Sequence, residues 1–472
     1  MTNAPGPDGS RPDALPRRLG LLDASTIVAG SMIGSGIFIV SAEATRRVPS
    51  ALGLLLVWLF TAVVTVAGAW SYGRLAVAYP HAGGQYVYLR EAWGDAGGFL
   101  YGWAMLLVIQ TGTIAAVGVA FAKYLGVLVP SVHPRPWLHA GFLRLSPVEL
   151  VGILVVAFLT WWNTRSVHRG AVLQNVFTVA KVVSLLGLLA FCFASGGRLS
   201  APDFRWGFEP GTVLGAPLFL LFAVAAVQPL FSADAWNNVT FLSEEVRDPA
   251  RTVPRALLIG TGLVTALYLL TNVGYLNVLS PDAIAHAEHD RVATAAVGAV
   301  TAGDVGKKLI AAVILVSTFG CLNGLILAGA RVLFAMSRDG LFFPFLGRVD
   351  ERTKIPRAAL VVQGVWAAAL TLTGKYGDLL DFVMIAILAF YVVTIAGRWK
   401  LSRTVPALAP RGVADRVVPA VYVALVLFVC AGQIAIQPAY PLWSLAIVAT
   451  GVPAYFLLRR RRRARAGAAT LP

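Results

Sequence analysis

Apolar segments long enough to cross a membrane recur along the whole chain, and this feature limits its fold more than any other. Many of these segments approach or exceed the roughly 20 residues that a helix needs to span the hydrocarbon core. Of the 472 residues, 57% are apolar and 13% are charged, whereas a soluble domain carries about a quarter charged residues. A membrane β-barrel would instead show alternating strands of about ten residues. The sequence therefore predicts an all-α polytopic membrane protein.

Twelve transmembrane helices can be placed on this pattern. A polar, Pro-rich segment at 1–20 precedes them and lacks the apolar core of a signal peptide, so we expect a short cytoplasmic tail there. A basic segment at 459–472 follows them and is expected to form a second cytoplasmic tail. The predicted spans lie near 21–45, 50–79, 85–128, 146–163, 170–195, 212–243, 255–279, 307–338, 357–374, 377–400, 415–436 and 440–458.

The distribution of basic residues predicts the orientation of these spans. With both termini on the cytoplasmic side, most of the 39 Lys and Arg residues fall in cytoplasmic loops and tails, as the positive-inside rule requires. Their scatter through short loops also argues against nucleic acid as the reason for the formal charge of +16. We therefore expect a multi-pass protein of the cell (inner or plasma) membrane. No cofactor, disulfide or metal site is indicated, because all three cysteines fall inside predicted spans: Cys192, Cys321 and Cys430.

The first predicted span contains an interruption at Gly34-Ser35-Gly36. Each glycine weakens a helix by about 1 kcal/mol relative to alanine. In hydrocarbon, unpaired backbone groups are tolerated only where they line a cavity or meet a ligand. Small residues also let helices pack closely, so this stretch alone fits a packing notch and a ligand site equally well.

The sixth predicted span contains a second interruption, within residues 227–238. Pro229 removes a backbone donor and kinks the helix. Asp234 is an ionisable group at membrane depth, which makes it a candidate functional residue. Aspartate is also a favoured helix N-cap, so a capping role for the following half-helix stands beside the functional one.

These two interruptions lie five spans apart. Because five is odd, a repeat of that length would be inverted in the membrane, and paired interruptions at corresponding positions point to a transporter's midplane site. Half-helix N-termini offer N–H groups to an anion, while unwound carbonyls accept hydrogen bonds from a cation. An amino acid carries both groups on one carbon, so the spacing predicts a carrier of a small zwitterion.

Lys181 is a charged residue within the apolar fifth span. It lies roughly 18 Å along the helix from Arg169, near the middle of the bilayer, where a lysine is costly. Snorkelling to the interface is the alternative. We interpret Lys181 as functional, because a fixed ammonium can stand where a sodium-coupled carrier holds its sodium ion and can brace the broken first span.

Together these residues resemble the amino acid–polyamine–organocation superfamily, most closely its L-type amino acid transporter branch in the prokaryotic form. The resemblance covers nearly the whole chain and rests on four motifs in family order. They are Gly34-Ser35-Gly36-Ile37-Phe38; Gln174-Asn175-Val176-Phe177 leading to Lys181; Phe231 to Trp236, followed by Ser243-Glu244-Glu245-Val246-Arg247-Asp248-Pro249 and Val253-Pro254-Arg255-Ala256; and Ser317-Thr318-Phe319-Gly320-Cys321-Leu322-Asn323-Gly324 with Arg331 and Ser337-Arg338-Asp339-Gly340.

The resemblance implies a LeuT-type fold and a set of residue roles. The fold has a ten-helix core at 21–400, made of a repeat at 21–195 and an inverted repeat at 212–400, with two additional helices at 415–458 and with spans 1 and 6 unwound at mid-membrane. Backbone N–H groups around Ser35 and Gly36 would bind the substrate carboxylate. Carbonyls near Met32, Phe231 and Asp234 would take its amino group, Phe231 would close the site as an aromatic gate, and Lys181 would replace the sodium site. The predicted substrate site comprises Ser31, Met32, Ile33, Gly34, Ser35, Gly36, Phe231, Ser232, Ala233, Asp234 and Trp236, with Lys181 as the surrogate for sodium.

Two departures from the family pattern affect partners and specificity. Animal members of this branch join a glycoprotein heavy chain through a cysteine between spans three and four, and the loop at 129–145 contains none. No disulfide-linked heavy chain is therefore expected. Asp234 stands where several relatives have glycine, and it could pair with a cationic side chain, carry a proton or cap a helix.

The leading functional hypothesis is a sodium-independent exchanger of neutral L-amino acids, with tolerance of cationic ones, working by alternating access. The alternatives are a proton-coupled amino acid or polyamine symporter on the same fold and, from another class, an amino acid sensor that does not transport. An enzyme is not expected. The expected partners are the amino acid substrate and the lipid bilayer, without nucleic acid, while the sequence leaves the oligomeric state and the preferred amino acid open.

Overall fold

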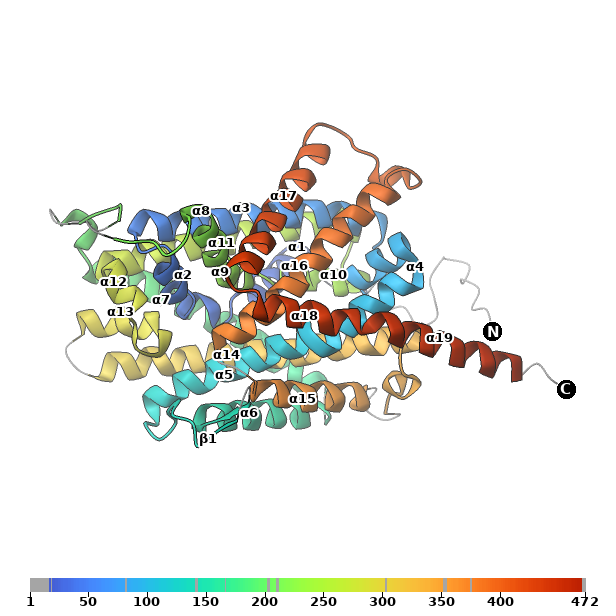
Figure 1. The fold of residues 1–472 in the computed structure, drawn as a ribbon, viewed down its shortest axis with the longest axis horizontal. Coiled ribbons are helices and arrows are strands. Elements are labelled where there is room, and N and C mark those ends of the chain that lie inside the picture. The colour runs from blue at the N-terminus through green and yellow to red at the C-terminus, as the bar shows by residue number, and fades with distance from the viewer. Residues whose placement is uncertain are drawn as a thin grey trace.

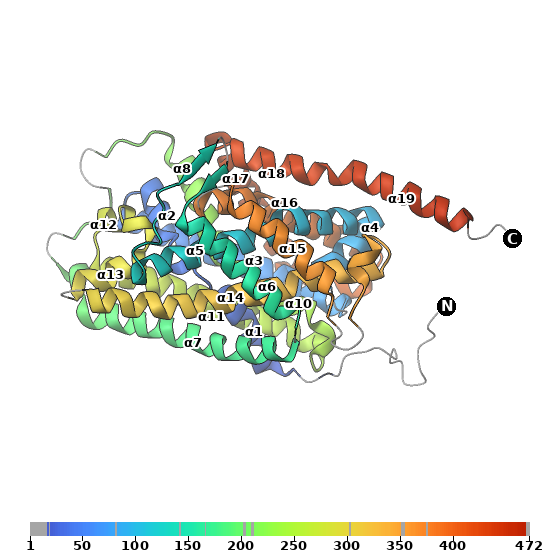
Figure 2. The ribbon, with the colours of Figure 1, turned by 90° about the horizontal axis from the view of Figure 1, so that it is seen from below.

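Most of the helices lie along the long axis of the molecule in two perpendicular views (Figure 1, Figure 2). This computed structural model describes residues 17–468, except 18, 81–82, 141–142, 166, 202–203, 209–211, 302–303, 351–354 and 374–375. The predicted tail at 1–20 therefore lies almost entirely outside the described residues. The predicted tail at 459–472 continues the last helix as far as Ala468, and its final residues lie outside the description.

Long apolar helices make up the body of the molecule. Among the described residues, eight have the length and hydropathy to cross a membrane, which fits a polytopic membrane protein. They are α3 (Ala51–Ala78), the composite Gln85–Leu128 formed by α4 (Gln85–Ala104), a π-helical turn (Met105–Ile109) and α5 (Gln110–Leu128), α7 (Val167–Ser195), α11 (Pro249–Val278), α14 (Asp304–Arg338), α16 (Tyr376–Leu401), α17 (Ala414–Ile436), and the pair α18 (Ala439–Ala449) and α19 (Gly451–Ala468).

Four shorter apolar helices complete the set in the described part of the chain. They are α1 (Leu21–Met32), α6 (Pro147–Asn163), the pair α8 (Leu218–Ala225) and α9 (Val227–Ser232), and α15 (Arg357–Thr371).

Helix starts follow local capping chemistry. Ser50 accepts a hydrogen bond from the N–H of Gly53 at the start of α3. At the start of α6, Ser146 and Glu149 form a reciprocal capping box, and Pro147 occupies the first turn. These groups satisfy donors that a helix end leaves unpaired.

Two small structures lie outside the long helices. The loop at 280–306 contains α12 (Pro281–Ala285), a 3₁₀ turn at Glu288–Asp290 and α13 (Val292–Val300). Its histidines show no metal site, since no group of three or more His, Cys, Asp or Glu side chains in the described part of the chain can hold a metal. The loop at 129–145 contains an antiparallel hairpin, β1 (Leu138–Ala140) and β2 (Leu143–Leu145), in which Leu138 pairs with Leu145.

Both predicted helix interruptions are present. Helix α1 ends at Met32 and is followed by a 3₁₀ turn (Gly36–Phe38) and α2 (Ser41–Arg47). The second interruption separates α9 from α10 (Asn238–Phe241), and inside it Ala235 has a left-handed φ of 65°. The helix thus continues past Pro229 and breaks after Ser232, because proline is tolerated in the first turn of the short α9.

The molecule has two distinct ends. The start of α4 and the end of α19 lie at one end, which we call the α4 end, while α12 and α13 lie at the other, the α12 end (Figure 1, Figure 2).

Leu19, just before α1, exchanges two backbone hydrogen bonds with the loop that follows α10. Its N–H donates to the Glu245 carbonyl at 3.0 Å, and its carbonyl accepts from the N–H of Arg247 at 2.8 Å.

Candidate functional site

The two broken segments meet at Gly36. A Cβ atom at this position would lie 1.9 Å from Ser232 Oγ and 2.7 Å from Ser232 Cβ, which is far closer than atoms can approach. Only glycine therefore lets the 3₁₀ turn of the first interruption contact the end of α9. This contact joins segments about 200 residues apart, as a shared midplane site requires.

Tyrosine hydroxyls pair with the carbonyls that the first interruption exposes. Tyr268 donates to the Met32 carbonyl at 2.9 Å, and Tyr275 donates to the Ile37 carbonyl at 3.2 Å. Tyr124 donates to the Phe38 carbonyl at 2.8 Å. These tyrosines were not predicted as partners of the first interruption, although Tyr268 and Tyr275 are seven residues apart and so share one face of α11.

Lys181 reaches the first span from α7. Its side chain is fully buried, and Nζ donates to the Gly30 carbonyl at 3.2 Å. This position excludes snorkelling to the interface. The contact lies in the last turn of α1, directly before the interruption, so the ammonium holds the end of this half-helix. The side chains of the preceding motif at 174–177 lie outside the described residues.

Asp234 lies in the second interruption and faces α16. Tyr391 donates its hydroxyl to Asp234 Oδ1 at 2.5 Å. The N-cap of α10 is Asn237. Asp234 therefore does not have the capping role that the sequence left open. A half-buried carboxylate with one hydroxyl partner keeps capacity to accept further hydrogen bonds.

A cavity opens next to Asp234, toward α10 and the start of α4. The cavity is small, because its empty space of about 470 Å³ includes open solvent at the mouth. Of the predicted site residues only Asp234 lines it. The other lining residues were not predicted, although glutamines and tyrosines inside apolar spans are a signal in the sequence. They are Gln85, Tyr101, Met105, Ile109, Gln110, Thr113, Ala235, Asn237, Asn238, Phe241, Leu325, Ile387, Phe390 and Tyr391.

The remaining predicted residues lie around the contact between the two interruptions or beside it. Ser232 is buried, and its hydroxyl has no hydrogen-bond partner among the described residues, so it is available to a ligand. Trp236 is buried against Tyr72, with ring centroids 4.9 Å apart, and lines no part of the cavity. Of the others, Ser31 and Phe231 are half-buried, and the rest are buried: Met32, Ile33, Gly34, Ser35, Gly36 and Ala233.

Comparison with known proteins decides the family. The model of the family described as amino acid permease matches residues 19–456. The chain belongs to the amino acid permease family. This permease is also similar to the large neutral amino acids transporter small subunit 2 of Homo sapiens, with 31% identity over 94% of the chain and 81% of the relative. The Asc-type amino acid transporter 1 of Mus musculus is 32% identical, with the same two coverages.

A third relative of this permease is the b(0,+)-type amino acid transporter 1 of Mus musculus. It is 28% identical over 94% of the chain and 88% of the relative. These matches confirm the resemblance to the L-type amino acid transporter branch. The permease is accordingly a membrane transport protein and not an enzyme.

Proposed function

We propose that this permease is a sodium-independent exchanger of L-amino acids that works by alternating access, with neutral amino acids as its main substrates. The observation that carries the proposal is the contact of two interrupted spans, with a buried ammonium bonded to the first. The relatives named for large neutral amino acids support the substrate class.

The proposed topology has twelve spans in a LeuT-type arrangement. The four shorter apolar helices and the eight long ones supply twelve crossings, with repeats at 21–195 and 212–400 and additional helices at 415–458. The cytoplasmic side is the α4 end, because the positive-inside rule places the basic C-terminal segment there. The α12 end then faces the outside of the cell membrane.

In the proposed substrate complex, backbone N–H groups around Ser35 and Gly36 bind the carboxylate, and the Ser232 hydroxyl adds a donor. Carbonyls of Phe231 and Asp234 take the ammonium group. The Met32 carbonyl contributes less than its place in the motif suggests, because Tyr268 already donates to it. Phe231 is the aromatic gate, and the cavity beside Asp234 takes the side chain or leads to the cytoplasm.

Two negative expectations belong to the same proposal. Lys181 occupies the role of a sodium ion, so transport needs no sodium gradient. The hairpin at β1 and β2 carries no cysteine, so no disulfide-linked heavy chain joins the permease at this loop.

Proteoliposomes test the proposal. Uptake of labelled leucine should require an amino acid inside the vesicles and should be unchanged when sodium is replaced by choline. Uptake into empty vesicles that follows an imposed pH gradient would instead establish the proton-coupled symporter. Stoichiometric binding without any uptake would establish the sensor.

Asp234→Asn is expected to change substrate preference more than turnover. The amide removes the negative charge beside the cavity and keeps the volume, so the ratio of arginine to leucine transport should fall at least tenfold. The measurement is a competition panel in proteoliposomes. Tyr391→Phe serves as the control, because it removes the 2.5 Å hydroxyl contact and keeps the carboxylate. An unchanged arginine-to-leucine ratio in Asp234→Asn would exclude Asp234 from specificity.

A further inference from the structure

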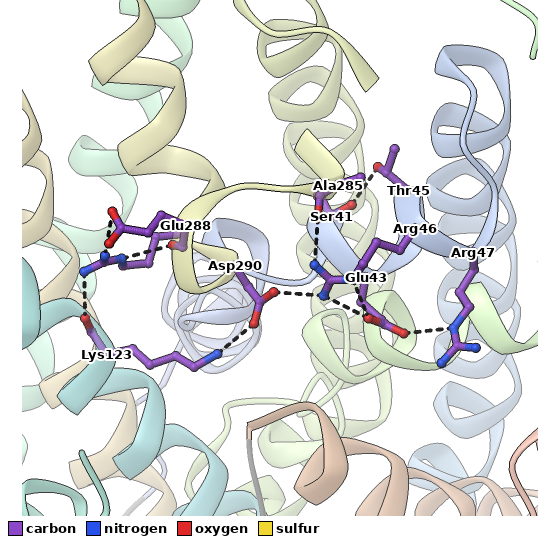
Figure 3. A network of polar contacts seen from close by, with 10 residues as sticks. Ser41, Glu43, Thr45, Arg46, Arg47, Lys123, Ala285, Glu288 and Asp290 are labelled. Atoms are coloured by element: carbon purple, nitrogen blue, oxygen red, sulfur yellow. Dashed lines mark hydrogen bonds and ion pairs between the residues drawn. The ribbon is translucent and has the colours of Figure 1, made fainter. Parts of the chain in front are cut away.

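Figure 3 shows a network of polar contacts at the α12 end, and four of its charged side chains connect three segments of the chain. Arg46 and Glu43 lie on α2, Lys123 lies near the end of α5, and Asp290 lies in the loop between α12 and α13. We name these four residues the outer clamp. Asp290 is its centre, because Oδ1 lies 2.8 Å from Arg46 Nη2 and Oδ2 lies 2.9 Å from Lys123 Nζ.

Further contacts attach the same loop to α2. Arg46 Nη1 donates to the Ala285 carbonyl at 2.7 Å, and Glu43 pairs with Arg46 at 2.9 Å. Glu43 therefore fixes the position of the Arg46 side chain, and Arg46 in turn binds the loop through both Ala285 and Asp290. Isolated surface ion pairs contribute little, but Lys123 is only 12% exposed and shares one carboxylate with Arg46.

The loop backbone is left-handed where it carries Asp290. His289 has a φ of 53° and Asp290 a φ of 64°, a region that aspartate and histidine adopt several-fold more often than most residues with a Cβ. Asp290 contacts Arg46 and Lys123 from this turn, and its two ion pairs hold the loop there.

The charge on Asp290 is maintained by its partners. Burial opposes ionisation, but Lys123 and Arg46 outweigh it and keep the pKa of Asp290 below its usual value. Its neighbours include His289, whose pKa is lowered by burial and by Arg291. The carboxylate therefore stays ionised throughout the neutral range, and the clamp does not depend on pH there.

We propose that the outer clamp is a latch that closes the α12 end of the transport path and must open before substrate can enter from that side. The inference rests on the proposed alternating access. Helix α2 is the second half of the interrupted first span, and the clamp fixes it to α5 and to the loop. Releasing Asp290 removes its ion pairs with both cations at once, and the hydrogen bond from Arg46 to the Ala285 carbonyl must also break before α2 and the loop separate.

Thr45 supplies a reporter that needs no substrate. It is fully buried on α2, next to Arg46, and its hydroxyl bonds only to the Ser41 carbonyl of its own helix in the described structure. Thr45→Cys in a background with alanine at the three native cysteine positions gives a single thiol. Its reaction with a membrane-impermeant maleimide, added outside full-length protein in liposomes, measures opening of the α12 end.

Asp290→Asn should label at least tenfold faster than the parent reporter protein. Glu288→Gln is the matched control, because Glu288 lies in the same 3₁₀ turn and is 81% exposed, and its ion pairs among the described residues are with His289 and Arg291 of the same loop. Its labelling rate should stay within twofold of the parent. Asp290→Glu keeps the charge and should restore slow labelling. If gel filtration shows that Asp290→Asn is not folded, Lys123→Gln is used in its place. It removes the ion pair between Lys123 and Asp290 and should also accelerate labelling.

Equal labelling rates in the parent and in whichever of these two variants folds would overturn the latch. The labelling test does not require that the protein exchange amino acids, so it can fail or succeed independently of the proposed function. Loss of exchange activity with the labelling difference intact would contradict the transport proposal alone.

Discussion

Replacing Lys181 with alanine should abolish at least nine-tenths of amino acid exchange while the protein remains inserted and folded. The ammonium donates to the Gly30 carbonyl in the last turn of α1, and no other residue holds that carbonyl in the described structure. Without it, the half-helix before the interruption loses the contact that sets its position. The N–H groups that we propose bind the substrate carboxylate are then misplaced, and small misplacements in a binding site have large effects on rate.

The stability of this variant should change little, because two effects offset. An unpaired buried carbonyl costs about 1–3 kcal/mol, but the substitution also removes a buried charge that is itself costly at membrane depth. The measurements are exchange in proteoliposomes and the melting temperature in detergent.

A control on the same helix separates function from packing. Val183 is 63% exposed and faces away from the core, so Val183→Ala should exchange at the wild-type rate. Normal exchange by Lys181→Ala would remove Lys181 from the mechanism and leave it as a packing residue.

Gly36→Ala is expected to cost both stability and transport. The added Cβ would lie 1.9 Å from Ser232 Oγ, so the two interrupted spans must separate. Overpacking of this kind costs about 1–3 kcal/mol, and the displaced segments also carry the proposed substrate contacts. We expect at least a tenfold loss of exchange together with a lower melting temperature.

A second substitution tests whether the clash is the cause. Ser232→Gly removes the two side-chain atoms that a Cβ at Gly36 would meet, and the remaining atom, Ser232 Cα, is 3.1 Å away. The double variant should therefore regain part of the lost stability. Gly187→Ala is the control, because its Cβ would meet nothing within 4 Å. A Gly36→Ala protein with normal melting and exchange would show that the two interruptions need not touch.

The sequence predicted the features that depend on local chemistry. Glycines at positions 34 and 36 weaken a helix and indicated the first interruption, whereas Pro229 indicated only the region of the second, because α9 continues past it to Ser232. A lysine surrounded by Val and Leu is equally conspicuous, and the structure pairs Lys181 with the first span.

The partners of these features could not be predicted in the same way. No local sequence pattern indicates that Tyr268 donates to the Met32 carbonyl or that Tyr391 donates to Asp234, because each pair joins distant spans. Trp236 belongs to a motif with Asp234, yet a left-handed residue between them, Ala235, turns the two side chains to different surroundings. The ion pairs of Asp290 likewise depend on three segments that meet only in the folded chain.

The backbone bridge at Leu19 has a consequence for how the α4 end moves. Leu19 precedes α1 and is bonded to the carbonyl of Glu245 and the N–H of Arg247, which follow α10. A displacement of α1 alone must break both hydrogen bonds, at about 1 kcal/mol each. A joint displacement of α1 and α10 breaks neither. The two half-spans at the α4 end should thus move cooperatively, and this end should populate two states in preference to a graded series.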